Sequence, residues 1–204
     1  MAFRLAVLLC CFAVPEVAGQ QPPTTLASAS TDFGDFTVVS LKSGANSIDL
    51  NGDGKPDVVF DAWRDNGNAH GFEVITFYLA DPDQTGQWRL LPLYDSTMRH
   101  ERDFYRTFMG ADCVLEDLVV VRSKANPHAP AELVLGSRQM GQSFVDSMPV
   151  TFTVYQFVSD SEATVGSPPY YFRATRVIRG RHRYCDINDA FEHELGLGHY
   201  PGRP

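Results

Sequence analysis

The strongest structural signal in the chain is the run Phe72-Glu73-Val74-Ile75-Thr76-Phe77-Tyr78-Leu79. Successive side chains of a strand point to opposite faces of a sheet. One face would then carry Phe72, Val74, Thr76 and Tyr78, and the other Glu73, Ile75, Phe77 and Leu79. Most of these residues are β-branched or aromatic, which favours a strand over a helix. We therefore predict a β-strand here, with partner strands on both sides of it in the sequence.

Further β-rich runs cover residues 36–41, 57–64, 118–122, 133–135, 150–158 and 170–178. Gly, Pro, Asn and Asp separate these runs, as is typical of turns between short strands. The pattern predicts a mainly β protein, built as an antiparallel sheet or a β-sandwich, with one or two short helices. One helix should begin after Asp186 and end at Gly196. A second is predicted within residues 98–108, with its charged residues on a solvated face.

The first 19 residues have the features of a secretory signal peptide. Arg4 gives a positive start, an apolar segment follows, and Val17 and Gly19 are small enough for a cleavage site. The apolar segment would reach only about 15 Å, roughly half of a bilayer core, which argues against a membrane anchor without excluding it. Lipid attachment at Cys10 is another alternative, although a leucine precedes it. We expect an exported protein, either periplasmic or secreted.

The rest of the chain divides into a lead-in and one domain. Residues 20–34 are rich in Pro, Thr, Ser and Ala, which predicts a flexible lead-in. Residues 35–204 have a globular composition and are enough for a single β-rich domain with a real core. The formal net charge of −8 suits neither a DNA nor an RNA backbone. No segment after the signal peptide is apolar and long enough to predict a membrane span.

Two cysteines, Cys113 and Cys185, remain once the signal peptide is removed. A pair of cysteines in an exported chain usually forms a disulfide, and we predict one here. Two buried free thiols are the alternative. The wide spacing of the pair argues against a zinc site of the C-x-x-C kind.

An ion site is predicted in the run Asp49-Leu50-Asn51-Gly52-Asp53-Gly54-Lys55-Pro56-Asp57. Calcium takes six to eight oxygen ligands, and alternate residues of a tight loop can direct theirs inward. The predicted structural calcium ligands are the side chains of Asp49, Asn51, Asp53 and Asp57 and the backbone carbonyl of Lys55. The position that usually supplies a bidentate glutamate is Phe60, so binding should be weak, on the order of 0.1–1 mM. A turn without an ion is the alternative.

The loop that follows the next predicted strand contains an aromatic ring, a cation, amides and an imidazole. Such loops often bind ligands, and the predicted contact residues are Trp63, Arg64, Asn66, Asn68 and His70. The Asn-Gly pair inside the loop is also a hairpin signal. The same polar side chains would then only stabilise the turn.

Several enzyme mechanisms are excluded by missing motifs. His193-Glu194 begins like a zinc-protease helix, but the second histidine of H-E-x-x-H is missing. The motifs S-x-x-K, G-x-S-x-G and H-x-H are absent as well. We therefore expect a non-catalytic protein, and predict no catalytic residues. A hydrolase that uses Asp61 and Asp65 remains an alternative. The basic cluster at residues 179–183 is expected to form a surface turn.

Several stretches together resemble the carbapenem self-resistance proteins of the CarG type. They are residues 48–60, 62–64, 68–72, 112–113, 115–117, 137–138, 141–144 and 150–152. The resemblance implies a bacterial periplasmic protein that protects its host from a carbapenem without being a β-lactamase. Protection would come from binding the drug, its target or another envelope protein. A calcium-stabilised envelope interaction module or enzyme inhibitor, with no role in resistance, is the alternative.

Overall fold

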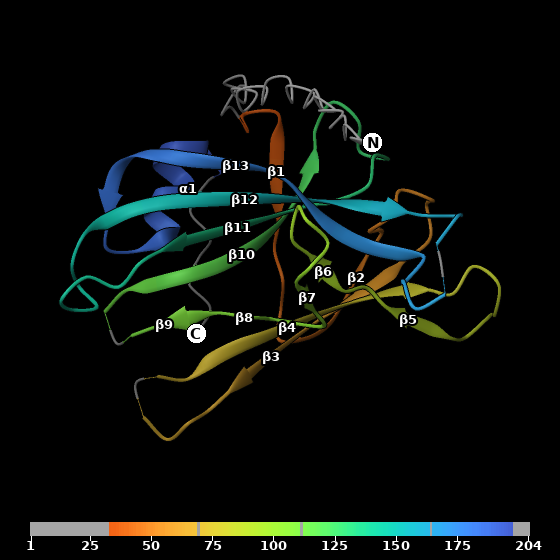
Figure 1. The fold of residues 1–204 in the computed structure, drawn as a ribbon, viewed down its shortest axis with the longest axis horizontal. Helices are drawn as coiled ribbons and strands as arrows, with labels where there is room; N and C mark the ends of the chain where they lie inside the picture. The colour runs from red at the N-terminus through yellow and green to blue at the C-terminus, as the bar shows by residue number, and fades with distance from the viewer. Residues whose placement is uncertain (1–32, 69, 111, 164, 198–204) are drawn as a thin grey trace, which may run out of the picture. The chain divides into compact units, whose positions relative to one another are not determined.

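The computed structural model describes residues 33–68, 70–110, 112–163 and 165–197. The predicted signal peptide lies outside the described residues, as does most of the predicted lead-in. Within this part of the chain the strands are β1 Phe36–Val39, β2 Gly44–Ile48, β3 Asp57–Arg64, β4 Phe72–Ala80, β5 Trp88–Leu90, β6 Leu93–Tyr94, β7 Glu101–Arg102, β8 Tyr105–Arg106, β9 Phe108–Met109, β10 Val114–Ser123, β11 Glu132–Arg138, β12 Met148–Ser159 and β13 Tyr170–Tyr184. A helix, α1, covers Ile187–Leu195 (Figure 1). The described residues contain no helix long and apolar enough to cross a membrane.

The strands form two sheets. The larger has the order β1-β10-β11-β12-β13-β6-β7, with β9 paired to β10. The smaller has the order β2-β3-β4-β5, with β8 paired to β4. Strands β13 and β6 pair in parallel, whereas the other pairings among the described residues are antiparallel. The predicted mainly β fold is confirmed.

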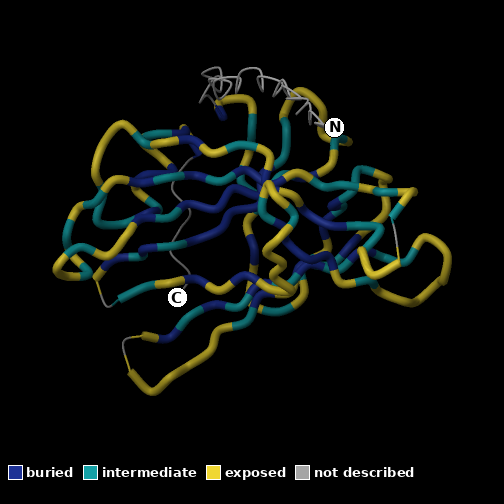
Figure 2. The backbone as a smooth tube through the Cα atoms, viewed as in Figure 1, coloured by how far each residue is buried: buried dark blue, intermediate teal, exposed yellow. Residues whose placement is uncertain are grey.

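The main core lies between the two sheets. Ile75, Phe77 and Leu79 of β4 share one face, as their alternation predicted, and that face is buried there. Phe77 meets Phe172 of β13 edge to face, with ring centroids 5.5 Å apart. Burial of large apolar side chains of this kind contributes roughly 1.5–3 kcal/mol each. Figure 2 shows the buried segments running through the strands, with the connecting loops mostly exposed.

The opposite face of the larger sheet is covered as well. A second apolar cluster joins this face to α1, through side chains that include Val119, Val121, Phe152, Ile187 and Phe191. A sheet covered on both faces needs no polar alternation. This explains why the centre of β10 reads Leu-Val-Val-Val over residues 118–121.

Helix α1 is confirmed with the predicted ends. The Asp186 side chain accepts a hydrogen bond from the Asn188 N–H at 2.8 Å, and Gly196 closes the helix in the left-handed conformation at φ 67°. Gly136 of β11 allows the helix to approach the sheet. A Cβ atom at Gly136 would lie 2.6 Å from Cγ1 of Ile187.

Two local predictions are wrong. Residues 98–108 do not form a helix but contain the short strands β7, β8 and the start of β9. Tyr105 and Thr107 are buried while Arg106 and Phe108 are exposed, and this alternation of period two is a strand pattern. The basic cluster at 179–183 is not a turn, because β13 continues through it to Tyr184 alongside β12.

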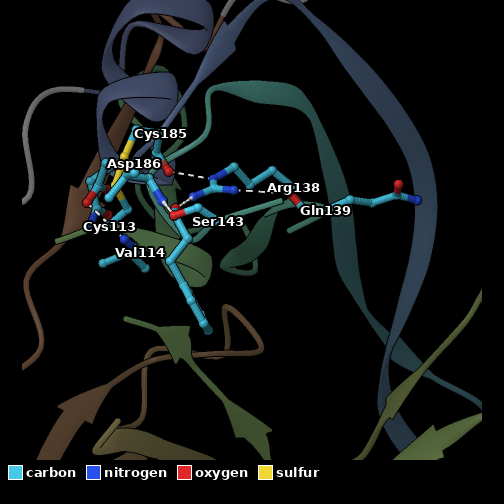
Figure 3. The surroundings of a disulfide bond; sticks show 10 residues. Cys113, Val114, Arg138, Gln139, Ser143, Cys185 and Asp186 are labelled. Atoms are coloured by element: carbon cyan, nitrogen blue, oxygen red, sulfur yellow. Dashed lines mark hydrogen bonds between the residues drawn. A yellow bond between two sulfur atoms is a disulfide. The ribbon is translucent and has the colours of Figure 1, made fainter. Parts of the chain in front are cut away.

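The predicted disulfide is confirmed (Figure 3). It joins Cys113 and Cys185, which are 72 residues apart in the sequence and have Cα atoms 5.7 Å apart. Beside it, the Val114 N–H donates a hydrogen bond of 3.0 Å to the carboxylate of Asp186. The start of α1 is therefore attached to the start of β10 by a covalent bond and a hydrogen bond.

Candidate functional site

The predicted calcium loop connects β2 to β3 and is closed by its own side chains. Its backbone N–H groups donate to side-chain oxygens: Gly52 and Gly54 to Asp49, Asp53 to Asn51, and Lys55 to Asp53, at 2.7 to 3.0 Å. Gly52 and Gly54 have φ values of 80° and 81°, which glycine adopts most readily. The oxygens at the first, third and fifth positions therefore turn back towards the loop backbone.

Asp57, the last predicted calcium ligand, faces the interior. It is buried and accepts hydrogen bonds from the N–H groups of Leu50 at 2.8 Å and Ala80 at 2.9 Å. Burial raises the pKa of Asp57, the two hydrogen bonds lower it in part, and the negative charges of Asp53 and Asp49 raise it further. Asp57 thus fastens the end of the loop to β4.

The described residues include no group of three or more His, Cys, Asp or Glu side chains placed to hold a metal ion. The acidic side chains of the loop would therefore have to act together with amide and carbonyl oxygens. Such mixed oxygen sets are the ones that calcium accepts. The calcium site stays a prediction.

The polar side chains of the β3–β4 hairpin stabilise its turn. Asp65 accepts the Gly67 N–H at 2.7 Å, and Asn68 accepts the His70 N–H at 2.8 Å. The Asn66 side-chain amide donates to the His70 carbonyl at 2.7 Å. Part of the predicted binding set therefore shapes the loop, and this role does not prevent contact with a ligand.

Two more residues of that set lie along the hairpin itself. The Trp63 indole packs on the hairpin backbone, because a Cβ atom at Gly71 would lie 2.1 Å from the ring. About half of the Trp63 side chain remains exposed, at 49%. The Arg64 guanidinium lies over the Phe72 ring, 5.2 Å from its centroid.

A pocket of about 360 Å³ opens beside this hairpin. Its lining residues are Asn66, His70, Gly71, Phe72, Arg106, Thr107, Phe108, Met109 and Phe144. The pocket thus brings together Asn66 and His70 of the predicted contact residues, whereas Trp63, Arg64 and Asn68 do not line it. The volume lies in the range of small-molecule sites, which is roughly 300–1,000 Å³.

The lining residues come from both sheets. Tyr105 and Arg106 form β8 on the smaller sheet, and Phe108 begins β9 on the larger one. The chain crosses between the sheets at Thr107, whose N–H donates to the Glu73 carbonyl and whose hydroxyl accepts the Glu73 N–H. This crossing places a cation and an aromatic ring next to the hairpin. Figure 1 shows β8 and β9 between β4 and β10.

Phe144 forms the aromatic centre of the pocket. Its ring centroid lies 5.5 Å from that of His70 and 5.7 Å from that of Phe108. Gly110 provides the space for this ring, because a Cβ atom at position 110 would lie 2.9 Å from the Phe144 ring. The loop between β11 and β12 therefore supplies one wall of the pocket.

Arg138 holds this loop in place. Its buried guanidinium donates hydrogen bonds to the backbone carbonyls of Cys185, Gln139 and Phe144. Figure 3 shows Arg138 reaching towards the disulfide. Burial lowers the pKa of Arg138, and the charges of Asp186 and Asp146 raise it in part. Through Arg138, the wall formed by Phe144 is connected to the disulfide.

A larger and more acidic pocket adjoins the first. It has a volume of about 720 Å³ and is lined by Glu101, Arg102, Asp103, Phe104, Arg106, Phe108 and Glu116. Arg102 forms an ion pair with Glu116 at 3.8 Å. Burial raises the pKa of Glu116, and the charges of Arg102 and Arg106 lower it in part. Arg106 and Phe108 line both pockets.

The two carboxylates of the hydrolase alternative lie in different surroundings. Asp61 is buried on β3 opposite Ile75. Asp65 is exposed in the hairpin loop, where it accepts the Gly67 N–H. This arrangement gives no support to a paired acid and base.

The chain matches a known protein family and a solved structure. A family model described as carbapenem resistance protein CarG-like matches residues 41–193. A crystal structure of CarG matches with a TM-score of 0.65 and 24% sequence identity, covering 78% of this chain and 98% of that chain. At that identity, the likeness shows the fold alone. No curated protein matches the chain.

Proposed function

The chain belongs to the carbapenem resistance protein CarG-like family, and from this we propose that it is an exported protein that protects its host by binding a carbapenem without hydrolysing it. The observation that carries this proposal is the pocket beside the β3–β4 hairpin. Aromatic rings from three separate segments meet there, at His70, Phe108 and Phe144. Pockets that hold small molecules combine such apolar walls with a few polar groups.

The chemistry of the pocket supports binding rather than hydrolysis. Its lining residues include no Ser, Cys, Lys, Asp or Glu. The Thr107 hydroxyl is engaged by the Glu73 N–H at 2.9 Å. Opening of a β-lactam ring needs an activated nucleophile beside a base, or a metal-bound water. The absence of the serine and zinc β-lactamase motifs from the sequence agrees with this reading.

Export is supported by two independent features. The first 19 residues have the composition of a signal peptide. The disulfide between Cys113 and Cys185 suits an oxidising compartment. We propose the periplasm as the site of action, because a protective binder there would meet the drug before it reaches its targets in the cell envelope.

We also propose that the Asp49–Asp57 loop binds structural calcium. The support is the spacing of its oxygen-bearing side chains and the two glycines with positive φ. The loop leads directly into β3, one strand of the hairpin beside the pocket. Calcium would therefore stabilise the base of that hairpin without taking part in ligand contacts.

Expression in a carbapenem-susceptible Gram-negative host tests the proposed function. Phe108 is 44% exposed and lines the pocket, and Phe60 is 43% exposed and lies outside it. We expect the native protein and Phe60→Ala to raise the minimal inhibitory concentration of meropenem. Phe108→Ala should lose most of this effect at equal periplasmic abundance.

The purified native protein should leave meropenem chemically intact, as followed by its ultraviolet absorbance. An unchanged inhibitory concentration with the native protein would contradict protection. Ring opening by the purified protein would contradict the proposal of binding without hydrolysis.

A further inference from the structure

Two guanidinium groups lie over the ring of Phe72. Arg64 lies 5.2 Å from the ring centroid and Arg106 lies 4.9 Å from it. The strand register explains the arrangement. Arg64 is directly opposite Phe72 on β3, and Arg106 is opposite Val74 on β8. Paired residues point to the same face of a sheet. Both arginines therefore lie on the outer face of the smaller sheet, away from its buried side.

The two guanidinium groups concentrate positive charge around one ring. Since each guanidinium carbon is near the same centroid, the two can be no more than about 10 Å apart, which is close to the Debye length at 0.1 M salt. Neither forms an ion pair with a carboxylate of the described residues, although Arg106 lies close enough to Glu116 for its charge to lower the pKa of that carboxyl. Other arginines are paired in this way, such as Arg89 with Asp81 at 2.8 Å and Arg102 with Glu116 at 3.8 Å.

Stacking on a ring leaves the donors of a guanidinium available. The aromatic ring meets the flat face of the group, and its five N–H bonds point outward in the plane. A planar carboxylate can accept two parallel N–H bonds from such a group. An incoming anion would also reduce the repulsion between the two arginines.

We propose that the Arg64–Phe72–Arg106 stack binds the carboxylate of a small ligand that has a single carboxylate group and an apolar body resting on Phe108 and Phe144. This inference rests on the proposed function and specifies the chemical class of its ligand. A carbapenem has this character, because its fused ring system carries one carboxylate. Arg106 lines the pocket and Arg64 does not, so Arg106 supplies the direct contact and Arg64 adds positive potential.

The neighbouring acidic pocket favours a single negative charge. Glu101, Asp103 and Glu116 line it, and Arg106 lies at the boundary between the two pockets. These carboxylates oppose a multiply charged anion such as a phosphate ester more strongly than a monoanion. The whole chain, at −8, adds to that effect.

Calorimetric titration with meropenem and with meropenem methyl ester tests the inference. We expect the native protein to bind the acid roughly tenfold to a hundredfold more tightly than the ester. Arg106→Gln should reduce acid affinity to the level of the ester and leave ester affinity unchanged. Arg64→Gln should cause a smaller loss of acid affinity, and added salt should weaken binding of the acid to the native protein.

A matched control is present elsewhere in the chain. Arg176 lies 4.9 Å from the Phe33 ring centroid, the same distance as Arg106 from Phe72, but lines neither of the two pockets. Arg176→Gln should bind both compounds as the native protein does. Arg106→Lys keeps the positive charge but loses the planar N–H donors of the guanidinium. Its affinity for the acid should lie between those of the native protein and Arg106→Gln. Thermal melting checks that each variant is folded.

The outcomes separate the two claims. Equal affinity for acid and ester, with no effect of Arg106→Gln, would overturn the carboxylate inference and leave the proposed binding function standing. Absence of binding of either compound to the native protein would overturn both. An equal loss of acid affinity in Arg176→Gln and Arg106→Gln would show a non-specific effect of charge. That result would also overturn the inference.

Discussion

A side chain at position 110 would occupy the space of the Phe144 ring, since its Cβ atom would lie 2.9 Å from that ring. Gly110→Ala should therefore displace Phe144 from the pocket. Overpacking of this kind costs about 1–3 kcal/mol. We expect a lower free energy of unfolding in urea and weaker binding of meropenem.

The same substitution in a Phe144→Ala background supplies the control. With the ring removed, the new methyl group has room, and the further loss of stability should be close to zero. If Gly110→Ala lowered the free energy of unfolding as much in the Phe144→Ala background as in the native protein, the contact between Gly110 and Phe144 would not explain the effect.

Single residues also show why the pocket was only partly predictable. Asn66 and His70 stand close together in a loop with a strong turn signal, so the sequence indicates them directly. Arg106, Phe108 and Phe144 join them only through the crossing at Thr107 and the hydrogen bonds of Arg138. No local pattern encodes these long-range contacts.

At the scale of elements, α1 is fastened to β13 through one carboxylate. Glu194 accepts the N–H groups of Arg181 at 2.9 Å and His182 at 2.8 Å, and the Tyr184 hydroxyl at 3.1 Å. Burial alone would raise the pKa of Glu194. The backbone and side-chain hydrogen bonds outweigh burial, so that the pKa of Glu194 lies below its ordinary value of 4.5.

This pKa gives a prediction with a definite sign. A carboxyl group with a lowered folded-state pKa contributes stability above its unfolded pKa and loses it as pH falls through the folded one. Glu194→Gln should therefore be less stable than the native protein at pH 7. The difference should shrink as pH falls below about 4.5. Urea unfolding of both proteins at a series of pH values measures it, and a difference independent of pH would contradict this role.

Elements with strong local signals were predictable, and those that depend on a partner were not. The run at 57–64 corresponds to β3 residue for residue, and Asp186 and Gly196 bound α1. Strand β2, Gly44–Ile48, was missed because its small and polar residues form a strand only through pairing with β3. The helix predicted at 98–108 failed because the alternating burial of β8 and β9 was hidden among charged residues.

At the scale of the whole molecule, the resemblance to the CarG-like family is confirmed over residues 41–193, as is the predicted disulfide. The disulfide closes a loop of 72 residues, worth about 4 kcal/mol in the chain-entropy model. One of its two cysteines, Cys185, also accepts a hydrogen bond from Arg138 through its backbone carbonyl. The disulfide is thus connected, through Arg138, to the loop that places Phe144 in the wall of the pocket.

Calcium should stabilise the whole domain if the Asp49–Asp57 loop binds it. At a calcium concentration tenfold above the dissociation constant, binding adds about 1.4 kcal/mol to the free energy of unfolding. Asp49→Asn should remove most of this increment. Asp160→Asn is the control, because Asp160 also accepts a backbone N–H in a turn but lies outside the loop. A melting temperature that is the same in calcium and in chelator would rule out the site.

The pocket beside the β3–β4 hairpin is proposed to hold a carbapenem intact. Titration of isotopically labelled protein with meropenem, followed by NMR of both partners, tests this proposal. We expect saturable shifts centred on His70, Arg106, Phe108 and Phe144, with the drug signals unchanged after release. Shifts confined to another surface, no shifts at all, or signals of a ring-opened drug would contradict it.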